Sequence, residues 1–373
     1  MTRIDAGNLF QTAPVAESAP QVAALPADYR EFVQQYVSGD HDEALAFLGN
    51  WNDERLRLQI KRLKEVVVTI RSCAQCPERQ AFVRFPLRAA ILLHGDREIQ
   101  QEFRPPTNEQ PPTCGVGLSA EAIVHLSAIL KLVDPKAGEF LRPFYLGMSR
   151  QARWSHCSVE SALWARSGLR MYPNDVPLTM ALGVALETGA FFTLAPSPST
   201  PAGGAVLARQ GAQLKMQIHS LEEGARQAFE KAARADPNLA EAKVRLGRVQ
   251  WRLGMRDAAR TTLEASLKIG DADSHYLSHL FLGRVLEEAS KWTEAETHYR
   301  AAIALQPLAE TPFVALSHVL FLQGDPEGAR DALAAGLEAT KHRITYDPWL
   351  PYLVTQTNDG ETLLATLRRG LSP

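Results

Sequence analysis

The chain has 373 residues, of which 45% are hydrophobic and 22% are charged, a composition that excludes a mostly disordered chain and a disulfide scaffold. Its 40 basic and 42 acidic residues leave a formal net charge of −2, so no overall basic field favours a nucleic-acid partner. No apolar run approaches the roughly 20 residues of a membrane-spanning helix, and the first residues lack the apolar core of a signal peptide. We therefore expect no nucleic-acid partner, no membrane span and a cytoplasmic location, or a periplasmic or secreted one if the N-terminus is incomplete.

The first third of the chain divides into two predicted segments. Residues 1–26 are expected to be a flexible lead-in, because residues 11–26 are rich in Ala, Pro and Gln and show no periodic apolar face. Residues 27–137 are expected to form an N-terminal helical region, interrupted by a Pro-rich loop at 103–118. Residues 27–50 carry a weak form of the repeat described below.

Two residue pairs in the sequence have spacings that can bind a metal. Cys73 and Cys76 form a CxxC motif, but a zinc site needs a second ligand pair and a redox motif needs a βαβ context, and neither is present. We expect ordinary thiols or a local disulfide, with Cys73 and Cys76 kept as weak metal candidates. His275 and His279 are one helical turn apart, but without an acidic or Cys partner they are expected on a solvated helix face. No cofactor is predicted.

An internal repeat is the strongest signal in the sequence. Small residues recur at spacings of 34, 36 and 34, namely Ala225, Ala259, Ala295 and Ala329. A larger side chain follows each after four residues: Phe229, Leu263, Tyr299 and Leu333. Two helices of about 12–15 residues with tight turns fill about 34 residues. The small residues would let the two helices approach closely, and the larger side chain would fill the gap to the next hairpin.

These positions resemble the tetratricopeptide repeat family. The best match is residues 276–307, which carry Leu282, Gly283, Trp292, Ala295, Tyr299, Ala302 and Pro307 in the order of that family's pattern. The resemblance implies an all-α fold, a right-handed α-solenoid of TPR-like helical hairpins over residues 138–341, after an atypical helical N-terminal region. Between Gly183 and Gly247 about 30 extra residues predict an insertion around 191–220, either an interrupted hairpin or an overlong second helix.

Residues 342–373 are expected to form a C-terminal cap. They begin with a turn dense in aromatic residues, at 346–352. The sequence from Asn358 to Glu361 has capping-box-like spacing and opens an amphipathic helix that ends at Gly370. We expect this helix to be the capping helix of the solenoid, because a stack of repeats needs a polar outer face at its end.

The resemblance also implies that the first helix of each hairpin lines a concave groove. The repeat phase then points seven residues into this groove: Arg245, Arg248, Arg252, Phe281, Arg284, His318 and Phe321. Guanidinium groups pair well with carboxylates, and the apolar patches between them suit hydrophobic side chains. The predicted partner is a protein or an acidic-hydrophobic peptide. A solvated basic edge with no ligand remains the alternative interpretation of this face.

The predicted function is that of a non-enzymatic scaffold or adaptor within a bacterial-type assembly, which binds a protein or peptide in the groove. No phosphate-binding loop, HExxH motif or nucleophile elbow is present, so no catalytic residue is assigned. One alternative is a metal-binding or redox protein that uses Cys73 and Cys76. Another is a structural homo-oligomer that associates through an exposed region around Trp349 and Tyr352. The sequence leaves the partner and the oligomeric state open.

Overall fold

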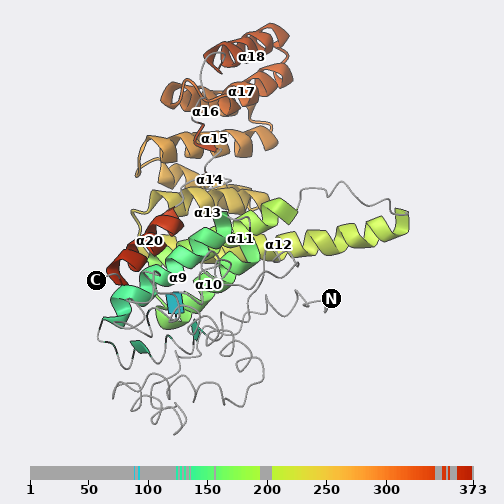
Figure 1. Ribbon diagram of the computed structural model, residues 1–373. Helices are drawn as coiled ribbons and strands as arrows, with labels where there is room; N and C mark the ends of the chain where they lie inside the picture. Colours follow the sequence, from blue (N-terminus) through green and yellow to red (C-terminus); the bar gives the residue numbers. More distant parts are fainter. Residues whose placement is uncertain are drawn as a thin grey trace, which may run out of the picture. The chain divides into compact units, whose positions relative to one another are not determined.

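The computed structural model describes residues 136–154, 157–193, 204–340, 347–349, 352 and 359–371, with isolated residues between 88 and 134. These residues divide into two compact units, one with α9, α10 and α20 and one that spans residues 179–357 (Figure 1). The fold is all-α, as the repeat pattern predicts. None of the described helices is both long and apolar enough to cross a membrane. The predicted lead-in 1–26, the weak repeat 27–50 and the loop 103–118 lie outside the described residues.

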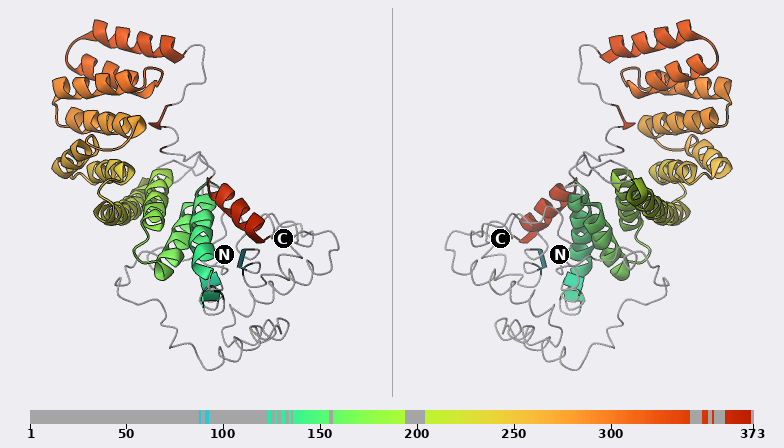
Figure 2. Two further views of the ribbon diagram at one scale, coloured as in Figure 1. Left: turned by 90° about the vertical axis from the view of Figure 1, so that its left-hand side faces the viewer. Right: turned by 90° about the vertical axis from the view of Figure 1, so that its right-hand side faces the viewer.

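The first unit contains a helical hairpin, α9 (Ala137–Trp154) and α10 (Ser158–Met171), and the C-terminal helix α20 (Asp359–Leu371). The predicted final helix therefore forms, but it packs against α9 within this unit instead of following the last repeat (Figure 2). The physical reason is a close helix crossing. A β-carbon on Gly147 would lie 3.1 Å from the Leu364 side chain, and one on Gly360 would lie 2.7 Å from the backbone nitrogen of Gln151.

The second unit is a stack of hairpins in chain order (Figure 1). Its helices are α11 (Val176–Thr193), α12 (Gly204–Ala235), α13 (Ala240–Arg252), α14 (Arg256–Ser266), α15 (Ala272–Glu288), α16 (Trp292–Leu305), α17 (Thr311–Leu322) and α18 (Pro326–Thr340). From α12 onward each helix packs against the next. The 32-residue α12 contains residues 204–220 of the predicted insertion, and residues 194–203 lie outside the described residues.

In three of the hairpins of this unit a glycine on the first helix faces a large side chain on the second. A β-carbon added to Gly183, Gly247 or Gly283 would lie less than 3.0 Å from the side chain of Phe229, Leu263 or Tyr299, respectively. The large residues were predicted to fill the gap to the next hairpin. Each covers the glycine of its own hairpin, and Leu263 also packs in one buried cluster with Phe281 and Val285 of the next hairpin. Such a contact brings the two helix axes closer than a β-carbon would allow.

The turns inside the hairpins also follow from the sequence. Gly254 and Gly324 follow the ends of α13 and α17 with φ angles of 77° and 84°, in the left-handed region where glycine has no steric cost. The same turn between α15 and α16 places Ser290 at φ 56°. Each turn reverses the chain within a few residues, which leaves the first helices of consecutive hairpins side by side.

Candidate functional site

The first helices of the hairpins share one face, which we call the inner face and which consists of residues of α11, α13, α15 and α17. Helix α13 packs against α15, and α15 packs against α17, so this face is continuous along the stack. All seven predicted groove residues lie on α13, α15 and α17. The structure places them in three different environments.

Arg245 and Arg248 are buried and share one carboxylate, Glu187 on α11. Arg245 Nη1 donates to Glu187 Oε2 at 2.8 Å, and Arg248 Nη1 donates to Oε1 at 2.6 Å. The three side chains are only 4–6% exposed. Burial alone would lower the pKa of Arg245, but the neighbouring Glu241, Tyr352 and Glu187 raise it, so the guanidinium group keeps its charge.

The sequence contains a signal for this cluster that the repeat pattern does not use. Glu187 is the only charged residue in α11, which is otherwise apolar or weakly polar from Val176 to Thr193. A single carboxylate in an apolar helix must find a cationic or hydrogen-bonding partner when the helix is buried. That rule predicts a partner for Glu187, although it does not say which arginine supplies it.

Two aromatic residues that follow the repeats, Trp349 and Tyr352, lie on these arginines. Their rings stack on one another, with centroids 5.7 Å apart, and Phe281 of α15 meets both edge-on at 5.6 and 5.4 Å. The Arg248 guanidinium carbon lies 5.2 Å from the Trp349 ring centre, and that of Arg245 lies 4.2 Å from the Tyr352 ring centre. These contacts are cation–π interactions that hold the rings against the inner face.

The Tyr352 hydroxyl extends this cluster by donating to Glu187 Oε1 at 2.7 Å. Burial raises the pKa of Tyr352, and the negative charge of Glu187 raises it further, so the hydroxyl keeps its proton. The prediction of an exposed Trp349 and Tyr352 region for self-association is therefore wrong. Tyr352 is 6% exposed and Trp349 is half-buried, because both rings are used within the chain.

Asp347 attaches the same stretch of chain at a second point. The Tyr276 hydroxyl donates to Asp347 Oδ1 at 2.8 Å, and the Thr311 hydroxyl donates to Oδ2 at 2.5 Å. The backbone N–H of Thr311, at the start of α17, points to Oδ2 as well, at 3.3 Å. A carboxylate at this place satisfies a free N–H at the beginning of a helix, where the helix dipole favours negative charge.

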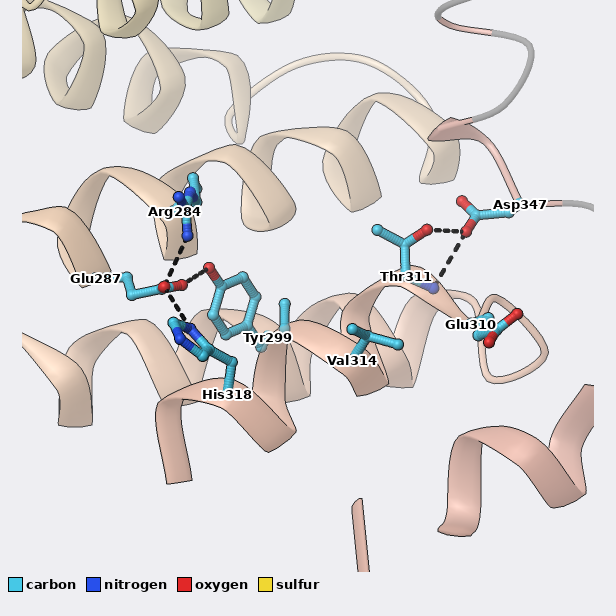
Figure 3. Close-up of a pocket in the computed structure, with 9 residues that line it drawn as sticks. Arg284, Glu287, Tyr299, Glu310, Thr311, Val314, His318 and Asp347 are labelled. Atoms are coloured by element: carbon cyan, nitrogen blue, oxygen red, sulfur yellow. Dashed lines mark hydrogen bonds and ion pairs between the residues drawn. The ribbon is translucent and has the colours of Figure 1, made fainter. Parts of the chain in front are cut away.

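Beside Asp347 a cavity of about 500 Å³ opens between α15 and α17 (Figure 3). At one end Glu287 accepts hydrogen bonds from Arg284 at 2.7 Å and from Tyr299 at 2.7 Å, and its contact with His318 Nδ1 is 2.8 Å. Figure 3 shows the Thr311 and Asp347 pair at the other end, with Val314 between the two polar groups. The cavity thus has polar ends and an apolar middle.

The predicted groove residues therefore fall into a covered part and an open part. The covered part consists of Arg245, Arg248 and Phe281, all buried beneath Trp349 and Tyr352. The open part consists of Arg284, His318 and Phe321, whose side chains are exposed by 45%, 56% and 64%. Arg252 belongs to neither, because it pairs with Glu222 of α12.

Cys73 and Cys76, the weak metal candidates, lie outside the described residues. Within the part of the chain that is described, no three His, Cys, Asp or Glu side chains gather as a metal site requires. Cys157, the residue before α10, is disulfide-bonded. The cytoplasmic location is tested by none of these observations and stays a prediction.

The spacing of His275 and His279 predicted a solvated helix face, and for His279 this prediction is wrong. Its Nδ1 lies 2.9 Å from Nδ1 of His298 on α16, so one of these two nitrogens donates a hydrogen bond to the other. Burial lowers the pKa of His279 to about 4, with further contributions from His298 and His275. Burial also lowers the pKa of His298, which has Glu264 and Arg260 among its charged neighbours.

This pair predicts a loss of stability in mild acid. The pKa of His279 in the folded protein, about 4, is below the reference value of 6.5. As the pH falls below 6.5 the unfolded chain therefore binds the proton first, and the contribution to stability disappears progressively toward pH 4. Thermal melts should show a smaller decrease in Tm over this range for His279→Gln than for the unsubstituted protein. His219→Gln, at an exposed position on α12, is the control, and an equal decrease in all three proteins would contradict the prediction.

Comparison with known families identifies the repeats. Two family models described as tetratricopeptide repeat match residues 223–279 and residues 280–343. The matched region begins in α12 and continues past the end of α18, so it includes α13, α15 and α17 of the inner face but not α11. No curated protein is detectably similar in sequence to this chain.

Several solved structures are similar in fold to part of the chain. MamA from Desulfovibrio magneticus RS-1 is 18% identical, with a TM-score of 0.40, and the match covers 55% of this chain and 98% of that one. The structure titled Pseudomonas aeruginosa pilF is 13% identical over 61% and 88%, with a TM-score of 0.42. YrrB, described as a TPR protein with an unusual peptide-binding site, is 14% identical over 54% and 87%, with a TM-score of 0.36.

Proposed function

The chain is a tetratricopeptide-repeat protein over residues 223–343, and we propose that it is a non-enzymatic scaffold whose inner face binds an extended segment of another protein. Repeats of this kind support protein interaction. Stacked hairpins present a long surface of side chains from many first helices, which suits an extended partner better than a small molecule. The observation that carries the proposal is the open cavity between α15 and α17.

The open part of the inner face has the chemistry of a peptide-binding surface. Phe321 is 64% exposed and Val314 is 47% exposed, although α17 is an apolar helix that packs against helices on both sides, α16 and α18. His318 lies between them on the same helix face, one turn from each. Exposed apolar side chains beside polar groups are typical of binding surfaces.

Arg284 supplies a positive charge to this surface. Its guanidinium group pairs with Glu287 at 2.7 Å and with Glu288 at 3.7 Å, but the side chain stays 45% exposed. Arginine can accept a second carboxylate through its remaining donors. The open part therefore suits a peptide with an acidic side chain near an apolar one, in agreement with the acidic-hydrophobic partner expected from the repeat phase.

The test uses peptides selected from a phage-displayed library of random short sequences on the unsubstituted protein. Arg284→Glu combined with Phe321→Ala should weaken binding of the selected peptides by about tenfold or more, because it removes both a charge and an apolar anchor. The control is Arg300→Glu on α16, whose side chain is exposed but belongs to a second helix. Equal binding to the double variant and to the unsubstituted protein, or a selection that enriches no peptide, would contradict the proposal.

A further inference from the structure

We propose that Asp347, Trp349 and Tyr352 are a tethered ligand of the inner face, and that the partner which displaces them carries the same chemistry: a carboxylate followed by two aromatic side chains. We call these residues, with Pro348, the groove segment. The inference rests on the proposed function, since it names the class of peptide and the regulation of the same face. It is carried by contacts that occupy the covered part of the predicted groove.

The first subsite is a receptor for a carboxylate. Two hydroxyl groups, of Tyr276 and Thr311, and the backbone N–H of Thr311 all point to the carboxylate of Asp347. Tyr276 is buried, and its hydroxyl therefore needs an acceptor. None of these donors depends on the covalent connection of Asp347 to the chain, so an acidic residue of a separate peptide can take its place.

The second subsite is a receptor for aromatic rings. Phe281 offers its edge to both rings, and Arg245 and Arg248 offer their guanidinium groups. The Arg248 Nε–H is buried and has no acceptor among the described residues, so the groove segment leaves one donor of this subsite unused. A carbonyl or carboxylate oxygen of a longer peptide can satisfy it, which gives a partner a contact that the tethered segment lacks.

The floor of the face does not depend on the groove segment for its charge balance. Glu187 pairs with both arginines, and Phe281 packs with Val244 and Leu282 in one buried cluster. Removal of the two rings would therefore expose an organised surface without leaving an unpaired buried charge. A preorganised surface of this kind is what a peptide needs for binding without a large ordering cost.

The groove segment is attached mainly by side chains. In the described part of the chain, its hydrogen bonds to the inner face are those of the Asp347 carboxylate and the Tyr352 hydroxyl. Two further hydrogen bonds, from the backbone N–H groups of Trp349 and Tyr352, stay within the segment and shape it locally. An attachment through a few side chains can be exchanged for the same groups on another chain.

Tethering makes this exchange a competition. A segment joined to its own binding site has an effective concentration on the order of millimolar, so it occupies the site even when its intrinsic affinity is modest. A partner binds only the fraction of molecules in which the segment is away, and its apparent affinity is lowered by that fraction. Weakening the segment should therefore strengthen binding of a separate peptide of the same sequence.

The probe is a fluorescently labelled peptide with the sequence of residues 345–354, TYDPWLPYLV. The full chain with Asp347→Ala, Trp349→Ala and Tyr352→Ala, the opened variant, should bind it at least about tenfold more tightly than the unsubstituted chain. A peptide with alanine at the positions of Trp349 and Tyr352 should not bind. Adding Thr311→Val to the opened variant should weaken binding of the labelled peptide, because it removes a donor to the Asp carboxylate. Binding of a peptide with Asn in place of Asp should be less affected.

The control is Leu333→Ala with Leu337→Ala, at exposed positions on α18, which leaves the groove segment in place and should bind the peptide as the unsubstituted chain does. Asp347→Asn keeps the shape of the segment and removes only the negative charge of its side chain, so it should raise peptide affinity by a smaller factor. This variant tests the proposal if the opened variant does not fold. An opened variant or Asp347→Asn variant that keeps its helical circular dichroism but binds no more tightly than the unsubstituted chain would overturn the proposal. The binding of library-selected peptides to the open part would be unaffected by that result, so the two proposals fail separately.

Discussion

Replacing Glu187 with alanine is expected to lower the free energy of unfolding of the repeat unit by about 3–5 kcal/mol. One carboxylate pairs with two guanidinium groups that are each only 4% exposed. Without it Arg245 keeps Glu241 as a partner, at 2.7 Å, whereas Arg248 keeps no carboxylate partner among the described residues. An unpaired charge in a buried position is far more costly than the loss of a favourable contact.

Urea denaturation followed by far-UV circular dichroism measures this difference. The matched control is Glu264→Ala, which removes a carboxylate from an exposed pair with Arg260 of the same 2.8 Å length. Because both partners of that pair are in contact with water, the control should change the free energy of unfolding by less than about 0.5 kcal/mol. If the two substitutions cost the same, the cluster around Glu187 is not buried as described.

The repeated hairpins could be predicted because their cause is local in the sequence. Gly283 and Tyr299 are only 16 positions apart, on either side of one tight turn, and a glycine and a large residue return at the same spacing one repeat earlier as Gly247 and Leu263. A contact that recurs at a fixed spacing leaves a visible period. An excess of residues over that period also predicted extra length before Gly247, and the 32-residue α12 lies in this part of the chain.

The occupied inner face could not be predicted because its cause is distant in the sequence. The repeat phase places Arg245 and Phe281 on the first helices, which is where they lie. The residues that cover them come from outside the repeats: Tyr352 is 165 positions from Glu187, to which it donates. Aromatic residues in a turn after the last repeat carry no period, and nothing local indicates whether they face solvent or fold back onto the stack.

Replacing Gly283 with valine is the second large effect that we expect, a loss of about 3 kcal/mol in the free energy of unfolding. A β-carbon at this position would lie less than 3.0 Å from three atoms of the Tyr299 ring. The ring cannot turn away, because it is 1% exposed and its hydroxyl donates to Glu287 at 2.7 Å. The α15 and α16 helices must therefore separate, which also disturbs the packing of α15 against α14 and of α16 against α17.

Helix propensity makes the sign of this result informative. Valine is intrinsically better than glycine inside a helix by a few tenths of a kcal/mol, so propensity alone predicts a slightly more stable protein. The control is Ser317→Val at the matching position of α17. There a β-carbon is already present, and Leu333, the residue equivalent to Tyr299, is 41% exposed and free to move. That substitution should change the free energy of unfolding by less than about 1 kcal/mol. A Gly283→Val protein as stable as the control would mean that the small-against-large fit does not set the spacing of the hairpins.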